Sequence, residues 1–156
     1  MVCFSQDKES RFIACVTDHS DLQLVFYDLK KGKHPITTTL ESEVDKISIN
    51  PDDTHTIAVT GNQVLKIFKV QESMIRPETN ISKVDLEQNF TDHDWLDADN
   101  LIAGTDRGKL YIITKKNQKF GKSERLIQLS TSGLMMLSTS GIFQSAVSRP
   151  SPKVLS

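Results

Sequence analysis

The sequence predicts an all-β protein, a partial β-propeller of about three four-stranded antiparallel blades. Short apolar runs recur along the chain, rich in β-branched and aromatic residues and bounded by turn residues, as is typical of strands. Phe26, Phe68 and Ile112 take matching places in these runs at separations of 42 and 44 residues. That period is close to the roughly 40–45 residues of a four-stranded propeller blade. Helical periodicity is poor, so we expect almost no helix.

Each copy of the pattern contains two strands joined by a turn. The predicted pairs are 12–16 with 22–28, 56–62 with 64–70, and 101–106 with 108–114. A first strand is predicted before each pair, at 2–5, 46–50 and 94–96. Outer strands are expected at the more polar segments 36–40, 81–87 and 126–130, because edge strands are usually short and polar. The blades then cover about 1–42, 43–88 and 89–130, and 131–156 is expected to be an incomplete strand and a flexible tail with serine and proline.

Composition indicates a globular protein and disfavours several functional classes. The 156 residues are 37% hydrophobic and 25% charged, with a formal net charge of −1. Nucleic-acid-binding domains usually carry a basic excess, and a membrane-spanning helix needs about 18 or more apolar residues in a row. The sequence has neither, and no signal-like leader opens it. We expect a soluble cytoplasmic protein that binds neither nucleic acid nor membrane, with Cys3 and Cys15 as small buried hydrophobes.

Several segments together resemble a known family. Residues 50–53 leading to 59–62, and 94–96 leading to 104–110, resemble the amino-terminal propeller of axonemal WD-repeat proteins. The opening 3–5 with 24–28 is similar to related ciliary WD-repeat proteins that tether inner dynein arms. The resemblance covers about residues 1–118.

The resemblance implies a non-catalytic scaffold that binds other proteins in the axoneme of cilia and flagella. Its role would lie in assembly of the inner dynein arms or of the regulatory complex, and so in ciliary motility. Its partners would be dynein-docking or tubulin-associated components, and no cofactor, metal or catalytic residue is implied. A general WD-repeat adaptor outside cilia, of the trafficking or ubiquitin-ligase type, is the alternative, and an enzyme built on a propeller is a third.

The chain also departs from the family pattern. Only Tyr27-Asp28 resembles the Trp-Asp dipeptide of the repeat, and no Gly-His dipeptide opens a blade, so we expect the buried His–Asp network of regular repeats to be absent. Family members are longer, with two propellers and a coiled coil. Three blades do not close a ring, so open sheet edges are expected to promote self-association.

The histidines are the first candidates for chemistry. His19, His34, His55 and His93 are all expected in loops. The segment 92–94, with Asp97 and Asp99 beyond it, is the one cluster that could attract a metal, but it lacks the spacing of a known calcium loop, and a solvated loop is expected instead. The sequence has no nucleophile elbow and no phosphate-binding glycine-rich loop.

Charge is unevenly distributed over residues 78–125, from the end of the second predicted blade into the third. Residues 78–106 hold eight acidic residues and one basic residue, whereas residues 107–125 hold seven basic and one acidic. Solvated loop faces are one interpretation. The other is a bipolar rim whose basic side meets an acidic partner such as a tubulin tail. The candidate residues of this basic rim are Lys115, Lys116, Lys119, Lys122 and Arg125.

Overall fold

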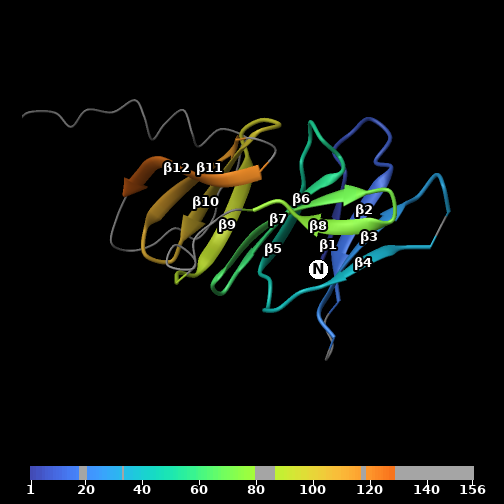
Figure 1. Cartoon of the computed structure of the whole chain (residues 1–156), viewed down its shortest axis with the longest axis horizontal. Helices are drawn as coiled ribbons and strands as arrows, with labels where there is room; N and C mark the ends of the chain where they lie inside the picture. Colours follow the sequence, from blue (N-terminus) through green and yellow to red (C-terminus); the bar gives the residue numbers. More distant parts are fainter. Residues whose placement is uncertain (18–20, 33, 80–86, 117–118, 129–156) are drawn as a thin grey trace, which may run out of the picture.

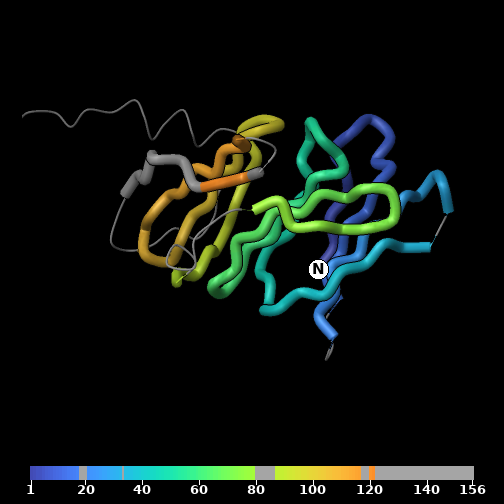
Figure 2. The backbone as a smooth tube through the Cα atoms, viewed as in Figure 1, coloured from blue at the N-terminus to red at the C-terminus, as the bar shows by residue number. Residues whose placement is uncertain are grey.

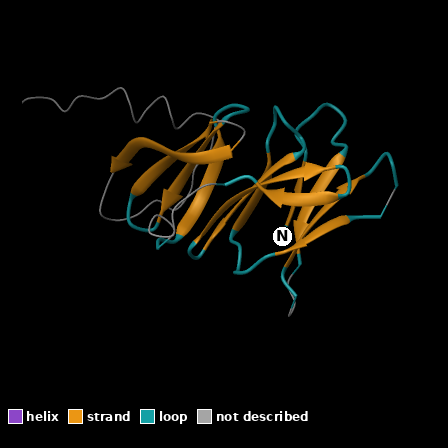
Figure 3. Ribbon diagram, viewed as in Figure 1, coloured by secondary structure: helices purple, strands orange, loops and turns teal. Residues whose placement is uncertain are grey.

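The computed structural model describes residues 1–17, 21–32, 34–79, 87–116 and 119–128. Within these ranges twelve strands form three four-stranded antiparallel sheets, and no helix occurs, so none is present that could cross a membrane (Figures 1 and 3). The sequence prediction of an all-β fold with three such sheets is confirmed. In Figure 2 the chain passes from one sheet to the next in sequence order, from blue to orange.

Each sheet is a meander of successive hairpins. The first holds β1 (Val2–Phe4), β2 (Phe12–Val16), β3 (Gln23–Asp28) and β4 (Ile36–Thr39). The second holds β5 (Lys46–Ile49), β6 (Thr56–Gly61), β7 (Val64–Gln71) and β8 (Met74–Pro77). The third holds β9 (Phe90–Trp95), β10 (Asn100–Thr105), β11 (Lys109–Lys116) and β12 (Lys119–Gln128). The leading strands β1, β5 and β9 contact one another in turn, and β4 contacts β8.

The second sheet lies between the other two and is buried on both faces (Figure 1). Because side chains alternate along a strand, β7 contributes to two cores. Phe68 and Val70 pack in the core shared with the first sheet, whereas Leu65 and Ile67 pack in the core shared with the third. Every residue of β6 is buried. Continuous apolar runs such as those of β6 and β7 are what a strand covered on both faces requires.

The cross-strand register corrects one part of the sequence prediction. Phe26 faces the second sheet and Ile67 faces the third, so each points to the following sheet, whereas Phe68 points back to the first. Ile112 alternates with the buried Ile113, which faces the second sheet, so Ile112 points away from it and is only half-buried. Matching Phe68 with Phe26 and Ile112 was therefore wrong by one residue, a slip that exchanges the two faces of a strand. Phe68 is a core residue as predicted, with 4% of its surface exposed; Ile112 is not.

Three predicted strands have different bounds in the structure. The outer strand predicted at 81–87 is instead β8, which was missed because only Ile75 of its four residues is buried; residues 80–86 lie outside the described ones. The strand predicted at 94–96 begins earlier, at Phe90, and the one predicted at 126–130 begins at Lys119. In β9 the buried positions include Asp92 and His93, so an apolar pattern does not mark this strand. The tail predicted at 131–156 lies outside the described residues.

Gly61 fixes the passage from the first sheet to the second. Gly61 is the last residue of β6, and the connection from β4 to β5 passes directly against it. A Cβ atom on Gly61 would lie 2.5 Å from the carbonyl oxygen of Glu43 and 2.9 Å from the Cα atom of Val44. Both neighbours are backbone atoms, which cannot rotate away, so this position requires glycine.

Candidate functional site

His93 lies on β9, fully buried at the interface between the second and third sheets. Its Nδ1 atom lies 2.7 Å from the Thr60 hydroxyl oxygen, and its Nε2 atom lies 2.7 Å from the Ser48 hydroxyl oxygen. Trp95 Nε1 donates a hydrogen bond of 3.0 Å to the same Ser48 oxygen. Since Ser48 and Thr60 belong to the second sheet, this histidine network holds the two sheets together.

The imidazole of His93 is neutral at neutral pH. Burial and, to a lesser extent, the ammonium of Lys46 lower its pKa to about 3, against the opposing effect of the Asp92 carboxylate. Lys46 and Asp92 form an ion pair across the same interface, and an Asp92 oxygen accepts the His93 backbone N–H at 2.9 Å. In a neutral ring one nitrogen donates and the other accepts, which matches two hydroxyl partners.

Two expectations about this segment were wrong. Residues 92–94 form part of a strand rather than a solvated loop, and His93 is therefore not in a loop. The buried network that His93 forms joins its ring to the hydroxyls of Ser48 and Thr60, so it differs from the His–Asp network of regular repeats. Ser48 beside His93 resembles a nucleophile and base, but the ring is enclosed and its low pKa makes it a weak base. Among the described residues, no three His, Cys, Asp or Glu side chains converge as metal ligands.

His34, His55 and both cysteines are less enclosed than His93. His34 and His55 lie in connections between strands, as predicted, and His19 lies outside the described residues. Cys3 and Cys15 are half-buried free thiols. Partial burial raises the pKa of Cys3 to about 11, which keeps that thiol protonated and unreactive at neutral pH.

A cleft of about 630 Å³ opens between the first and second sheets. Its walls come from the connections β3–β4 and β5–β6 and from the β7–β8 turn, and its floor is apolar. The floor residues are Phe12, Phe26, Ile36 and Val70, of which only Ile36 is more than slightly exposed. The sequence did not indicate this cleft, because its lining residues come from separate connections that lie far apart in the chain.

Aromatic rings cover one side of the cleft. Phe12 and Phe26 stack with ring centroids 5.3 Å apart. The ring of His55 meets Phe12 edge-on at 4.9 Å and lies 5.8 Å from Phe26. The guanidinium carbon of Arg11 lies 4.9 Å from the Phe12 centroid, a cation–π distance.

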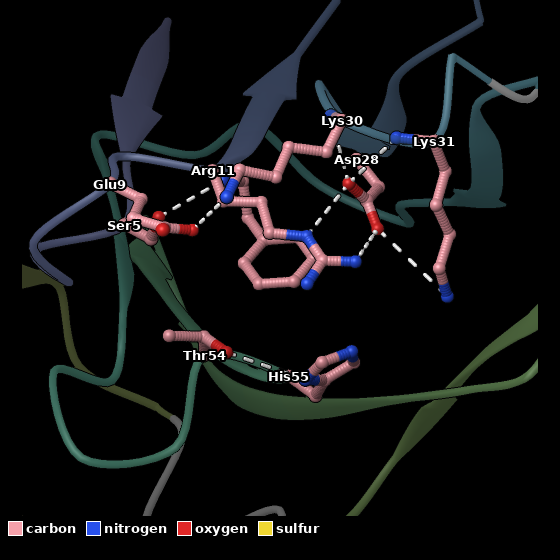
Figure 4. Close-up of polar contacts among 9 residues, drawn as sticks. Ser5, Glu9, Arg11, Asp28, Lys30, Lys31, Thr54 and His55 are labelled. Carbon is pink, nitrogen blue, oxygen red and sulfur yellow. Dashed lines mark hydrogen bonds and ion pairs between the residues drawn. The ribbon is translucent and has the colours of Figure 1, made fainter.

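Asp28 organises the rim of the cleft (Figure 4). Arg11 donates to both of its carboxylate oxygens, over 3.0 Å from Nε and 2.7 Å from Nη2. The backbone N–H groups of Lys30 and Lys31 donate to Oδ1 at 3.0 and 3.2 Å. Gly32 follows in a left-handed conformation with φ of 55°, and its N–H donates to the Asp28 carbonyl. These bonds fix the β3–β4 connection and with it the position of Lys31.

The local electrostatics at this cleft are positive on the side of His55. The hydrogen bonds from Arg11 outweigh the opposing effect of burial and hold the pKa of Asp28 well below its usual range. The carboxylate is therefore ionised at neutral pH. Partial burial lowers the pKa of His55. The cations of Lys69, Lys31 and Arg11 lower it further, against one carboxylate, that of Asp53.

The predicted basic rim maps to the β11–β12 hairpin of the third sheet. Lys116 is exposed, and Lys115 is half-buried with its ammonium 5.4 Å from the Phe120 ring centroid. Lys116 pairs with Lys119 across the hairpin. The side chains of Lys119, Lys122 and Arg125 are not among the described ones, although their backbone lies on β12.

Comparison with known proteins adds two relatives, and no family model matches the chain. Cilia- and flagella-associated protein 57 of Mus musculus is 26% identical over 134 residues, which is 84% of this chain and 10% of that protein. The chain therefore spans about a tenth of the length of this curated relative. The crystal structure of the Cps50 (Swd1) β-propeller domain of Myceliophteria thermophila matches with a TM-score of 0.67 and 15% identity, over 87% of this chain and 46% of that one. The described part accordingly has the fold of part of a β-propeller, and the resemblance to axonemal WD-repeat proteins is confirmed as a distant sequence similarity.

Proposed function

We propose that this chain is a non-catalytic protein-interaction scaffold of the ciliary or flagellar axoneme. The observation that carries the proposal is a stack of propeller sheets in a chain similar to a protein named for cilia and flagella. Stacked sheets form a rigid frame whose connections and rims present binding residues. In the arrangement most like a catalytic pair, Ser48 with His93, the histidine ring is fully buried, which supports a binding role over a catalytic one.

The finer part of this proposal concerns partners. We place the chain in inner-dynein-arm or regulatory-complex assembly, where it binds dynein-docking or tubulin-associated components and supports ciliary motility. The basic rim on the β11–β12 hairpin supports an acidic partner such as a tubulin tail, since unlike charges accelerate association and screening by salt weakens it. No cofactor enters this role.

A WD-repeat adaptor outside cilia, acting in trafficking or ubiquitin ligation, is the second candidate. The observation that favours it is the fold itself. One fold hosts many functions, so the likeness to the Cps50 (Swd1) propeller, with a TM-score of 0.67, does not tie the chain to the axoneme.

Localisation separates the two candidates. The full-length protein, tagged and expressed in cells with motile cilia, is expected along the axoneme and in the fraction that resists detergent extraction. A signal confined to the cell body of normally ciliated cells would contradict the axonemal role and favour the adaptor.

The basic rim has its own test, in which the chain is sedimented with taxol-stabilised microtubules. Lys116→Glu is expected to reduce the bound fraction, and the effect should fade at high salt because the charges are screened. The matched control is Lys8→Glu, an equally exposed lysine of the first sheet, which should bind as the unaltered chain does. Equal losses in both variants would show that net charge, and not the rim, governs binding.

A further inference from the structure

We infer that the cleft between the first and second sheets docks an acidic peptide segment of a partner protein through one aromatic side chain. This inference rests on the proposed scaffold role and names a site and a partner chemistry for it. The site is separate from the basic rim, which lies on the third sheet.

The cleft has the size and openness suited to a side chain of a larger partner. Its 630 Å³ falls within the roughly 300–1,000 Å³ of ligand pockets. A small molecule is usually enclosed over most of its surface, whereas more than half of the residues lining this cleft are themselves exposed. The exposed lining residues are Lys31, Gly32, His34, His55, Glu72 and Ser73. An open cleft of this kind receives one anchoring side chain while the rest of the partner stays outside.

The floor favours an aromatic anchor. Phe12 and Phe26 are already stacked, and His55 meets Phe12 edge-on at the open side. Aromatic rings prefer offset-stacked and edge-to-face neighbours, so an incoming ring extends an arrangement that exists in the unbound chain. Val70, 4% exposed, adds an apolar wall from the second sheet.

The rim favours a carboxylate beside that anchor. Arg11 binds both carboxylate oxygens of Asp28 and two backbone N–H groups bind Oδ1, so the Lys31 ammonium is a secondary charge partner of Oδ2. The Lys31 ammonium lies 4.0 Å from Asp28, and its side chain is 60% exposed. An exposed ion pair at this distance is weak, so the ammonium can turn toward an incoming anion; Figure 4 shows Lys31 beside Asp28.

The opposite lip gives the bound segment a direction. Glu72 stands on the β7–β8 turn and is exposed. A carboxylate of the peptide is attracted by Lys31 and repelled by Glu72, so the acidic side of the anchor lies toward the β3–β4 connection. Because hydrogen bonds to Asp28 fix that connection, Lys31 is held in place before the partner arrives, and little ordering is required on binding.

The test measures binding of a fluorescein-labelled synthetic peptide, one phenylalanine flanked on each side by two glutamates, to the purified chain by fluorescence anisotropy at low salt. The control peptides carry alanine for the phenylalanine, or glutamine for every glutamate. The inference predicts that both controls bind at least about fivefold more weakly, since one loses the anchor and the other loses the charges.

Protein variants locate the site. Lys31→Glu is expected to weaken binding about three- to tenfold, and Glu72→Lys to strengthen it by a similar factor, because each reverses one exposed charge beside the bound carboxylate. Lys8→Glu makes the same charge change at an exposed position outside both the cleft and the basic rim, and it is expected to leave the affinity unchanged. All three positions are exposed, so unchanged circular dichroism spectra are expected.

The inference is overturned if the unaltered chain binds none of the peptides, if the alanine peptide binds equally well, or if Lys31→Glu and Lys8→Glu weaken binding to the same extent. The last result would assign binding to overall charge. These failures leave the scaffold role standing, because axonemal localisation tests that role separately. If the protein binds the peptide as expected but is absent from the axoneme, the axonemal role is refuted and the docking site in the cleft still stands.

Discussion

Truncation of Phe68 is expected to destabilise the protein far more than truncation of Ile112. Phe68 is 4% exposed and packs in the core between the first and second sheets. Removing a buried phenylalanine side chain to alanine costs about 3–5 kcal/mol, through lost transfer free energy and the cavity left behind. A domain of this size has a total free energy of unfolding of about 5–15 kcal/mol, so Phe68→Ala removes a large part of it.

Ile112 provides the matched comparison. It lies on the face of β11 that points away from the second sheet, and it is half-buried. A buried isoleucine truncated to alanine loses about 2–5 kcal/mol, so a half-buried one is expected to lose about 1–2 kcal/mol.

Urea unfolding followed by fluorescence measures both variants. Trp95 is the only tryptophan and lies 5% exposed between the second and third sheets, so its emission reports loss of the stack. With a slope of about 2 kcal/mol per molar urea, the midpoint should fall by about 1.5–2.5 M for Phe68→Ala and by about 0.5–1 M for Ile112→Ala. Equal shifts, or a larger shift for Ile112→Ala, would refute the strand register.

Three further outcomes are expected. Burial holds the pKa of His93 at about 3, against 6.5 when the ring is exposed in the unfolded chain. Below about pH 6.5 the unfolded state therefore binds a proton that the folded state does not. The free energy of unfolding should fall as pH falls toward 3, by at most about 1.4 kcal/mol per pH unit. Unfolding midpoints between pH 7 and 4.5 should show this slope, His93→Gln should remove it, and the exposed His55→Gln should keep it. Gly61→Ala should destabilise by about 1–3 kcal/mol because the added Cβ meets backbone atoms, whereas the exposed Thr37→Ala should change the urea midpoint little. The chain alone should self-associate in reducing buffer, because β1 forms an edge of the first sheet and its Phe4 is 55% exposed. Light scattering that finds a monomer at every protein concentration would contradict this prediction.

The strands buried on both faces were the easiest to predict from the sequence. In β6 and β7 nearly every inward position is apolar, so the runs stand out against their polar turns. β9 was located poorly because two of its buried positions are Asp92 and His93, whose partners Lys46, Ser48 and Thr60 lie more than thirty residues earlier in the chain. A pattern of apolar residues does not reveal polar groups that are satisfied across an interface.

The cleft could not be predicted from the sequence, for a related reason. Tyr27-Asp28 was noticed for its likeness to the repeat dipeptide, but the role of Asp28 depends on Arg11, which is seventeen residues away and adjacent only after β2 and β3 pair. Lys31 and Glu72 line the same cleft only because the first sheet stacks on the second. Charge runs along the chain pointed to the third sheet instead, since a run is visible in sequence and a convergence of single charges is not.

The account depends most on the second sheet lying between the other two, and amide hydrogen exchange measures this directly. Amides of β6 and β7 are expected to exchange most slowly, because both faces of these strands are covered and their hydrogen bonds open only when the stack opens. Those of β2 and β3 should exchange faster, because one face of the first sheet is only half-buried. Exchange from β6 as fast as from β2 and β3 would contradict the stacked order of the three sheets.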